Sequence, residues 1–184
     1  MSIKLGYLFK LPSYKTSSIS PEVIVDLEKF LNLCEGSCSQ CNTPFCVDVG
    51  PRNAIIQLPN GADVLNLNPN FQAIFECCSK NSLTGVQIFG MYNDGTYELR
   101  SFCPVHGVNE DPANGSGAGS VGVFFALNNP SIISSDFAHL LFNQGKILGR
   151  NALIRVAIKL SANGLYDIHV GGGSKICISG TAEI

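Results

Sequence analysis

The residues best suited to chemistry lie between Arg100 and Leu127. The carboxyl group of Asp111 precedes a run of small residues that begins at Gly115, and an uncharged apolar run follows and ends at Leu127. A helix without charge on any face is usually buried rather than laid on a surface. We therefore predict a central helix over residues 116–127, with its N-terminus open to a cleft.

The start of this helix has the properties of an anion-binding site. The first N–H groups of a helix have no backbone partner, and the helix dipole adds partial positive charge there. Glycines leave room for a ligand, so Gly115, Ser116 and Gly117 are candidates for binding a substrate carboxylate. Asp111 supplies a nearby carboxyl group for proton transfer. A structural role is equally open, because Asp111 or Asn114 can cap the helix.

Two further side chains, those of Arg100 and His106, are candidates for the chemistry of the site. Arg100 can hold a substrate carboxylate through two parallel hydrogen bonds, or it can form an ion pair with Glu98 or Glu110. His106 lies in the loop before Glu110 and Asp111 and can shuttle protons near neutral pH. The other two histidines are interpreted as packing or strand residues.

The run from Arg100 to Gly117 is similar to the signature of the phenazine-biosynthesis PhzF-like family. The residues that carry the resemblance are Arg100, Phe102, Pro104, Gly107 and the continuous segment 110–117, EDPANGSG. The family's usual form of that segment is EDPATGSA. Asn114 therefore stands where threonine is common, and Gly117 stands where alanine is common.

The resemblance extends over about residues 12–180 and includes the later segment 144–150, QGKILGR. It implies an α+β fold like that of diaminopimelate epimerase, in which two similar halves each wrap a β-barrel around a central helix. On this basis we expect residues 1–184 to form one PhzF-like domain that corresponds mainly to the family's C-terminal half. Residues 1–20 are expected to form a strand and a linker.

The resemblance also implies an activity, an isomerase or epimerase reaction by cofactor-free proton transfer on a small carboxylated metabolite. Asp111 would transfer a proton or hold the substrate, while Gly115 and Ser116 would bind its carboxylate. The family's proposed catalytic glutamate and partner histidine lie in its N-terminal half, and no segment here matches them. A second chain is therefore expected to complete the site, either a second copy in a homodimer or a separately encoded N-terminal half. The alternative is a non-catalytic protein that binds small acids or another protein.

Composition argues against several other classes. Only 14% of the 184 residues are charged, 45% are hydrophobic, and the net charge is −2. Nucleic acid is not expected as the main partner, because phosphate binding needs clustered Lys and Arg. No run of 18 apolar residues predicts a membrane span, and no signal-peptide pattern opens the sequence. We therefore expect a cytoplasmic protein.

Four of the eight cysteines lie close together at Cys34, Cys38, Cys41 and Cys46. Thiolates at such spacings can wrap a zinc ion tetrahedrally, but the spacing is irregular and lacks paired CxxC motifs. Without a secretion signal, free thiols in a reducing compartment are favoured over disulfides. We expect no metal site and no cofactor.

Apolar periodicity and turn residues predict the remaining elements. Helices are expected at 21–33 and from 68 to about 80, and a hairpin is expected to join strands 83–92 and 96–103. The segment 136–143 reads as either a short helix or a strand. Other strands are predicted at residues 4–10, 45–49, 53–58, 62–67, 150–160, 164–170 and 174–180.

Overall fold

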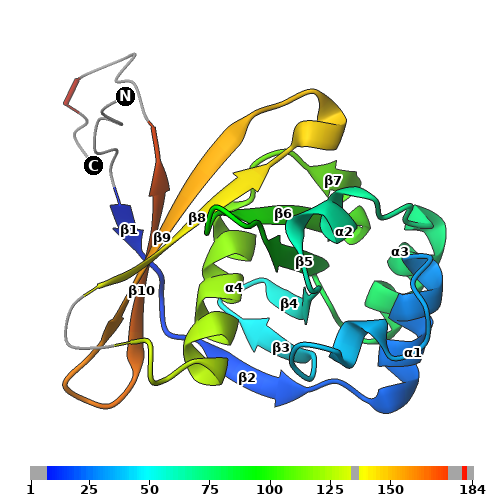
Figure 1. Cartoon of the computed structure of the whole chain (residues 1–184), viewed down its shortest axis with the longest axis horizontal. Helices are drawn as coiled ribbons and strands as arrows, with labels where there is room; N and C mark the ends of the chain where they lie inside the picture. The colour runs from blue at the N-terminus through cyan, green and yellow to red at the C-terminus, as the bar shows by residue number, and fades with distance from the viewer. Residues whose placement is uncertain (1–7, 134–136, 174–179, 182–184) are drawn as a thin grey trace.

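A computed structural model describes residues 8–133, 137–173 and 180–181 of this chain. One ten-stranded sheet curves around a long helix, α4 (Gly115–Asn128), as Figure 1 shows. Three shorter helices, α1 (Pro21–Phe30), α2 (Gly61–Leu65) and α3 (Phe71–Lys80), cover the opposite face of part of the sheet. This is the α+β arrangement, a half-barrel around a central helix, that the sequence predicts.

The strands follow the order β1-β10-β9-β8-β6-β5-β4-β3-β2, and β7 pairs with β6 beside this path. The β4–β5 and β6–β8 pairs are parallel, because α2 and α3 cross over between the first pair and α4 between the second. The strand bounds are β1 Leu8–Lys10, β2 Lys15–Ser18, β3 Phe45–Asp48, β4 Arg52–Gln57, β5 Gly85–Met91, β6 Tyr97–Cys103, β7 Val108–Asp111, β8 Ala138–Gln144, β9 Ala152–Leu160 and β10 Tyr166–Gly172.

Helix α4 is buried on all sides, as its uncharged sequence predicts. Every residue from Gly117 to Ala126 is buried, and the helix contacts β3, β4, β5, β9 and β10. Phe124 has no exposed surface, stacks on Phe45 with 4.6 Å between ring centroids, and meets Phe89 edge-on at 5.8 Å. The predicted central helix is therefore confirmed, with one additional residue at each end.

A second core lies on the other side of β3–β6, beneath α1 and α3 (Figure 1). Its fully buried side chains include Leu27 and Ile74 from the helices and Ile88 and Phe102 from the sheet. Because β6 carries Phe102 toward this core and Leu99 toward α4, the strand is buried on both faces. β6 ends at Cys103, and a short turn leads from it into β7, which carries Glu110 and Asp111.

Two local predictions were wrong, and a third falls only partly on the described residues. Residues 62–67 were expected to be a strand, but 61–65 form α2, because Asn60 accepts the N–H of Asp63 at 2.9 Å and caps a helical turn. The linker expected before residue 20 contains β2, which pairs with β3. The strand expected at 4–10 is described only at its end, β1.

The C-terminal region follows the predicted strand pattern. Of the two forms left open for residues 136–143, the structure shows a strand, β8, which continues to Gln144. Helix α1 ends at Phe30, three residues earlier than expected. Most of the strand expected at 174–180 lies outside the described residues. Among the residues that are described, no helix is long and apolar enough to cross a membrane.

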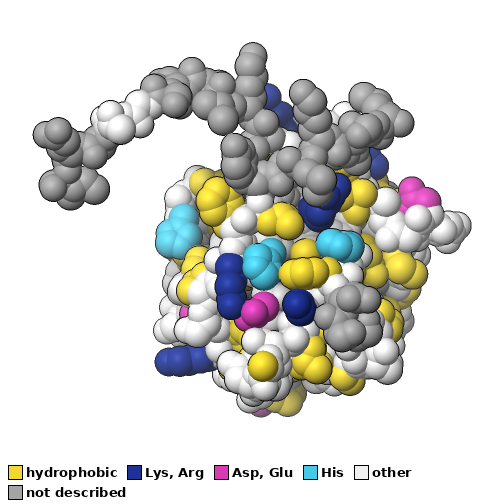
Figure 2. Space-filling view, turned by 90° about the vertical axis from the view of Figure 1, so that its left-hand side faces the viewer, with side chains coloured by type: hydrophobic (Ala, Val, Ile, Leu, Met, Phe, Trp, Pro, Cys, Tyr) yellow, Lys and Arg dark blue, Asp and Glu magenta, His cyan; other side chains and the backbone are white. Residues whose placement is uncertain are grey.

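The outer face of β8–β10 mixes aromatic and cationic side chains, and Figure 2 shows hydrophobic, histidine and Lys or Arg groups gathered on this side. His139 and His169 pair across the sheet with the same residue of β9, Ala157, so they lie in one row. The Phe137 ring lies 6.2 Å from the His139 ring and 5.6 Å from the His169 ring. Both histidines are strand residues, as the sequence indicates.

Candidate functional site

The candidate site lies where β6, β7 and the N-terminus of α4 meet. β7 runs antiparallel to β6, with Ser101 opposite Asp111 and a register shift between Ser101 and Cys103. Three residues separate the end of β7 from the first residue of α4, Gly115. The hairpin therefore brings Asp111 to the first turn of the buried helix, as the sequence predicts.

Asn114 is the residue that caps α4, so of the two caps that the sequence left open the structure shows this one. Its side-chain Oδ1 accepts the N–H of Gly117 at 2.7 Å and the hydroxyl of Ser116 at 2.9 Å. Its Nδ2 donates to Ser101 Oγ at 2.8 Å and contacts Cys103 Sγ at 3.6 Å. The hydrogen-bonding capacity of this carboxamide is therefore filled, which fixes its orientation.

Asp111 ends β7 and is only half-buried. Its Oδ1 accepts the N–H of Ala113 at 2.9 Å, a local turn that holds the carboxyl group beside the helix start. Within the described residues, the hydrogen bonds of this carboxyl are confined to Oδ1. The second oxygen, Oδ2, is therefore available to accept a proton or a hydrogen bond from a ligand.

Of the three residues predicted to bind a ligand at the first turn of α4, only Gly115 and Ser116 have a backbone N–H group that is free of partners in the described part of the chain. Gly117 N–H is occupied by the Asn114 cap and is buried, so the predicted contribution of Gly117 to ligand binding has no free donor. Gly115 is exposed and Ser116 is half-buried, and a helix leaves the N–H groups at these first positions without backbone acceptors. Ser116 Oγ donates inward to Asn114, so its lone pairs remain open to a donor from a ligand.

A row of buried amides supports this first turn from inside. Asn53 donates to Ser120 Oγ at 3.0 Å, and Ser120 Oγ donates to Ser116 O at 2.9 Å. Gln87 donates to Asn53 Oδ1 at 3.2 Å, and its own Oε1 is buried against Gly117 without a hydrogen-bond partner among the described residues. Sequence reasoning missed these residues, although a single amide inside an apolar strand is a recognisable signal.

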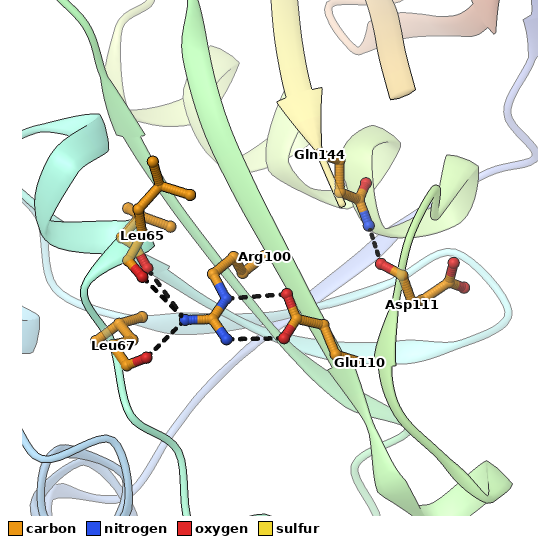
Figure 3. A network of polar contacts seen from close by, with 7 residues as sticks. Leu65, Leu67, Arg100, Glu110, Asp111 and Gln144 are labelled. Carbon is orange, nitrogen blue, oxygen red and sulfur yellow. Dashed lines mark hydrogen bonds and ion pairs between the residues drawn. The ribbon is translucent and has the colours of Figure 1, made fainter. Parts of the chain in front are cut away.

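Gln144 also contacts the motif, and sequence reasoning noted its segment without assigning it to the site. Its Nε2 donates to the carbonyl oxygen of Asp111 at 2.6 Å, and its Oε1 accepts the N–H of Asn114 at 3.2 Å. Figure 3 shows the first of these contacts, which reaches from the end of β8 to the end of β7. A single side chain therefore spans the turn between strand and helix.

Arg100 forms a buried ion pair, one of the two roles that the sequence left open for it. Its Nε and Nη2 donate to the two carboxylate oxygens of Glu110 at 2.9 and 2.7 Å (Figure 3). Its Nη1 donates to Leu67 O at 2.7 Å, and the side chain is 3% exposed. Because these partners occupy the guanidinium from both sides, Arg100 joins β6, β7 and the segment after α2 and is not free to bind a ligand.

His106 lies at the far end of the same hairpin from Asp111. It is exposed in the 3-10 turn η2 (Pro104–His106), between the last residue of β6 and the first of β7. The structure brings together Asp111, Gly115 and Ser116 but gives no contact that joins His106 to them. The predicted proton-shuttling role of His106 therefore stays a prediction.

The cysteines do not form a metal site in the part of the chain that the structure describes, where no group of three or more His, Cys, Asp or Glu side chains is arranged to hold an ion. Cys38 and Cys46 are buried, whereas Cys34 and Cys41 are exposed. Burial and the nearby Glu28 raise the pKa of Cys38 to about 12. Burial also raises the pKa of Cys103, the thiol nearest the helix start.

The fold is that of a PhzF or epimerase-like half-barrel, and comparison with known proteins agrees. Residues 3–183 match the sequence model of the PhzC-PhzF family, described as phenazine biosynthesis-like protein, and the chain belongs to this family. The match runs over nearly the whole chain. The expectation that the resemblance is to the C-terminal half of the family alone is not borne out.

Curated relatives include proteins of a fungus and of bacteria. Antisense-enhancing sequence 1 of Schizosaccharomyces pombe is 42% identical over 176 residues, which cover 96% of this chain and 58% of that protein. An uncharacterized isomerase of Escherichia coli K12 is 28% identical over 137 residues, covering 73% of this chain and 43% of that protein. The chain therefore spans roughly half the length of the curated relatives it matches.

Solved structures confirm the fold. The PhzF-family phenazine biosynthesis protein of Bacillus anthracis aligns with a TM-score of 0.77 at 14% identity, over 90% of this chain and 56% of that one. A predicted epimerase of Pseudomonas aeruginosa aligns with a TM-score of 0.62 at 19% identity, over 94% of this chain and 58% of that one. At these identities the likeness supports the architecture and not a particular substrate.

Proposed function

We propose that this chain is an isomerase-type protein that moves a proton on a small carboxylated metabolite without a cofactor. The observation that carries the proposal is the placement of Asp111, with a free carboxylate oxygen, beside the uncapped N–H groups of Gly115 and Ser116. Membership in the PhzF family and similarity to proteins named as isomerases support the same class of reaction.

Each group has a distinct task in this proposal. The N–H groups of Gly115 and Ser116 bind the substrate carboxylate, because the helix end carries partial positive charge and no side chain of Gly115 blocks approach. Asp111 exchanges a proton with a carbon atom or holds a neighbouring polar group of the substrate. Ser116 Oγ, which donates inward to Asn114, accepts a hydrogen bond from the ligand.

The reaction needs a second acid–base group on the opposite side of the substrate. Among the described residues, Asp111 Oδ2 has no hydrogen-bond partner that could serve as this group, and the chain spans roughly half the length of the curated relatives it matches. We propose that a second chain provides this group, either a second copy in a homodimer or a separately encoded chain. Light scattering of the purified protein distinguishes a dimer from a monomer. We also propose that the protein is cytoplasmic.

The test is proton exchange with solvent. The protein is incubated in D2O with a panel of small unsaturated and amino carboxylic acids, and deuterium incorporation at carbon is followed by proton NMR. We expect Asp111→Asn to abolish incorporation while leaving the fold intact. The matched control is Asp26→Asn, which neutralises an exposed carboxyl on α1. Full activity in Asp111→Asn would refute the proposed role.

A second candidate is a non-catalytic protein that binds small acids at the same helix end. The free N–H groups at the start of α4 favour this alternative, since they can bind a carboxylate by themselves, whereas proton transfer also needs a second acid–base group. It predicts that small acids raise the melting temperature of the wild type, because a ligand that binds the native state stabilises it. It also predicts no deuterium incorporation with any acid of the panel.

A further inference from the structure

The side chain of Gln144 forms a bridge across the turn that carries the proposed site. It connects the carbonyl of Asp111, the last residue of β7, with the N–H of Asn114, the cap of α4. Gln144 is only 1% exposed, so water cannot readily replace either hydrogen bond, and losing one costs free energy. The two contacts fix the direction of the amide, since a flipped group would set its NH2 against an N–H and its oxygen against a carbonyl.

The segment after Gln144 is shaped to keep the bridge in place. Gly145 has a φ of 86°, and a Cβ atom there would lie 2.7 Å from the carbonyl oxygen of Pro112, so only glycine allows this approach. Lys146 is the next residue, and its Nζ lies 3.6 Å from Glu98 and 5.3 Å from the centre of the Tyr92 ring. The turn after β8 is thus packed against the motif at one end and anchored to the β5–β6 hairpin at the other.

We infer that Gln144 is a positioning residue for the site, which sets the direction of the Asp111 carboxyl and of the first N–H groups of α4. This inference rests on the proposed function for its consequence in catalysis, but the geometry it describes can be measured without a substrate. Asp111 and Asn114 are held at their backbone atoms, so the bridge acts on the turn itself. Proton transfer is sensitive to such placement, because an error of about 1 Å in a reacting group can cost a factor of about 100.

The inference is tested with two substitutions and one matched control. Gln144→Leu removes both contacts, whereas Gln144→Glu keeps an acceptor for Asn114 N–H and replaces the donor to Asp111 with an oxygen. The control is Asn143→Leu, which removes an amide one residue earlier on β8 that donates to Thr96 Oγ1 and Tyr97 O, both at 3.3 Å.

The first measurement is amide hydrogen exchange by NMR on the full chain. Loss of its acceptor should raise the exchange rate of Asn114 by about fivefold or more in Gln144→Leu and should shift the resonances of Gly115 and Ser116. Neither change is expected in Asn143→Leu. Unchanged exchange and unchanged resonances in Gln144→Leu would overturn the inference.

The second measurement is deuterium incorporation with whichever acid of the panel the wild type accepts. Gln144→Glu should lower kcat by about tenfold or more, while KM changes by less than about threefold, because the broken contact holds Asp111 rather than the anion-binding amides. A kcat equal to that of the wild type would overturn the inference. If the wild type accepts no acid, the proposed function fails by itself, and the amide measurements alone decide the role of Gln144.

Discussion

The Arg100–Glu110 ion pair should be a main determinant of stability at the site, and Glu110→Gln is the perturbation that tests it. The carboxylate accepts from Nε and Nη2 of Arg100 at 2.9 and 2.7 Å, and the two side chains are 3% and 4% exposed. In Glu110→Gln, the amide can still accept one hydrogen bond, but its NH2 group faces an N–H of the guanidinium. The positive charge of Arg100 is then buried without a counter-ion.

The magnitude follows from the burial of both partners. Breaking a buried pair by removing one charge costs about 3–5 kcal/mol, because the remaining charge is left uncompensated in a region of low polarity. One retained acceptor and the carbonyl of Leu67, 2.7 Å from Nη1, place the expected loss near 3 kcal/mol, at the lower end of this range. Glu76→Gln, an exposed carboxylate on α3, should cost less than about 0.5 kcal/mol and is the matched control.

The assay is equilibrium unfolding in urea, followed by circular dichroism and by tyrosine fluorescence so that two-state behaviour can be checked. A double variant, Arg100→Met with Glu110→Leu, removes both charges and should recover part of the loss. Recovery should be incomplete, because Leu67 O then lacks its donor, at a cost of about 1–3 kcal/mol. A loss below about 1 kcal/mol in Glu110→Gln would refute the reasoning and would reopen the interpretation of Arg100 as a residue that binds substrate.

Three further predictions concern the core and a buried carboxyl. Phe124→Ala should cost about 3–5 kcal/mol in urea unfolding, because it removes a fully buried ring at the centre of α4, and a loss under about 1 kcal/mol would contradict that placement. Gly122→Ala should cost about 1–3 kcal/mol in the same assay, since a Cβ would lie 2.7 Å from Val156 Cγ1 in the closed core. Burial raises the pKa of Glu98, so the folded state holds this proton to higher pH than the unfolded state, and the wild type loses stability as pH rises. The melting temperature of Glu98→Gln relative to that of the wild type should therefore increase as the pH is raised from about 4.5 towards neutrality, and a constant difference would contradict this.

The elements that the sequence predicted well are those with strong local signals. Helix α4 has no charge and an unambiguous apolar run, and the β5–β6 hairpin has a clear Asn-Asp-Gly turn. Residues 62–67 were misassigned because a short apolar run reads equally as a strand or a helix, and the cap at Asn60 decided the outcome. Strand β2 consists of four exposed residues, and only pairing with β3, a tertiary contact, makes it a strand.

The candidate site also combines features that local sequence predicts with features that depend on long-range contacts. Asp111, Gly115 and Ser116 are adjacent in sequence, so their convergence at one helix end follows from local structure alone. Which cap forms, and where Arg100 points, depend on partners 10 to 36 positions away, and no pattern in the motif distinguishes the alternatives. Local sequence patterns therefore identify the chemical groups of the site, while long-range contacts determine which of them remain free.

The bridge from Gln144 and the cap at Asn114 hold the same turn through different atoms. The threonine that is common at position 114 of the family motif lacks an amide donor, whereas Asn114 donates to Ser101 and contacts Cys103 behind the turn. The contact from Gln144 reaches the backbone N–H of residue 114 and the backbone carbonyl of Asp111, so it is independent of the side chain at position 114. A bridge made to backbone atoms tolerates exchange of the capping residue, and Asn114→Thr should therefore leave the Gln144 contacts in place while loosening the link to Ser101. Amide exchange rates at Asn114 in the wild type and at the same position in the variant that agree within about threefold would support this independence, and a larger increase would show that the cap and the bridge hold the turn jointly.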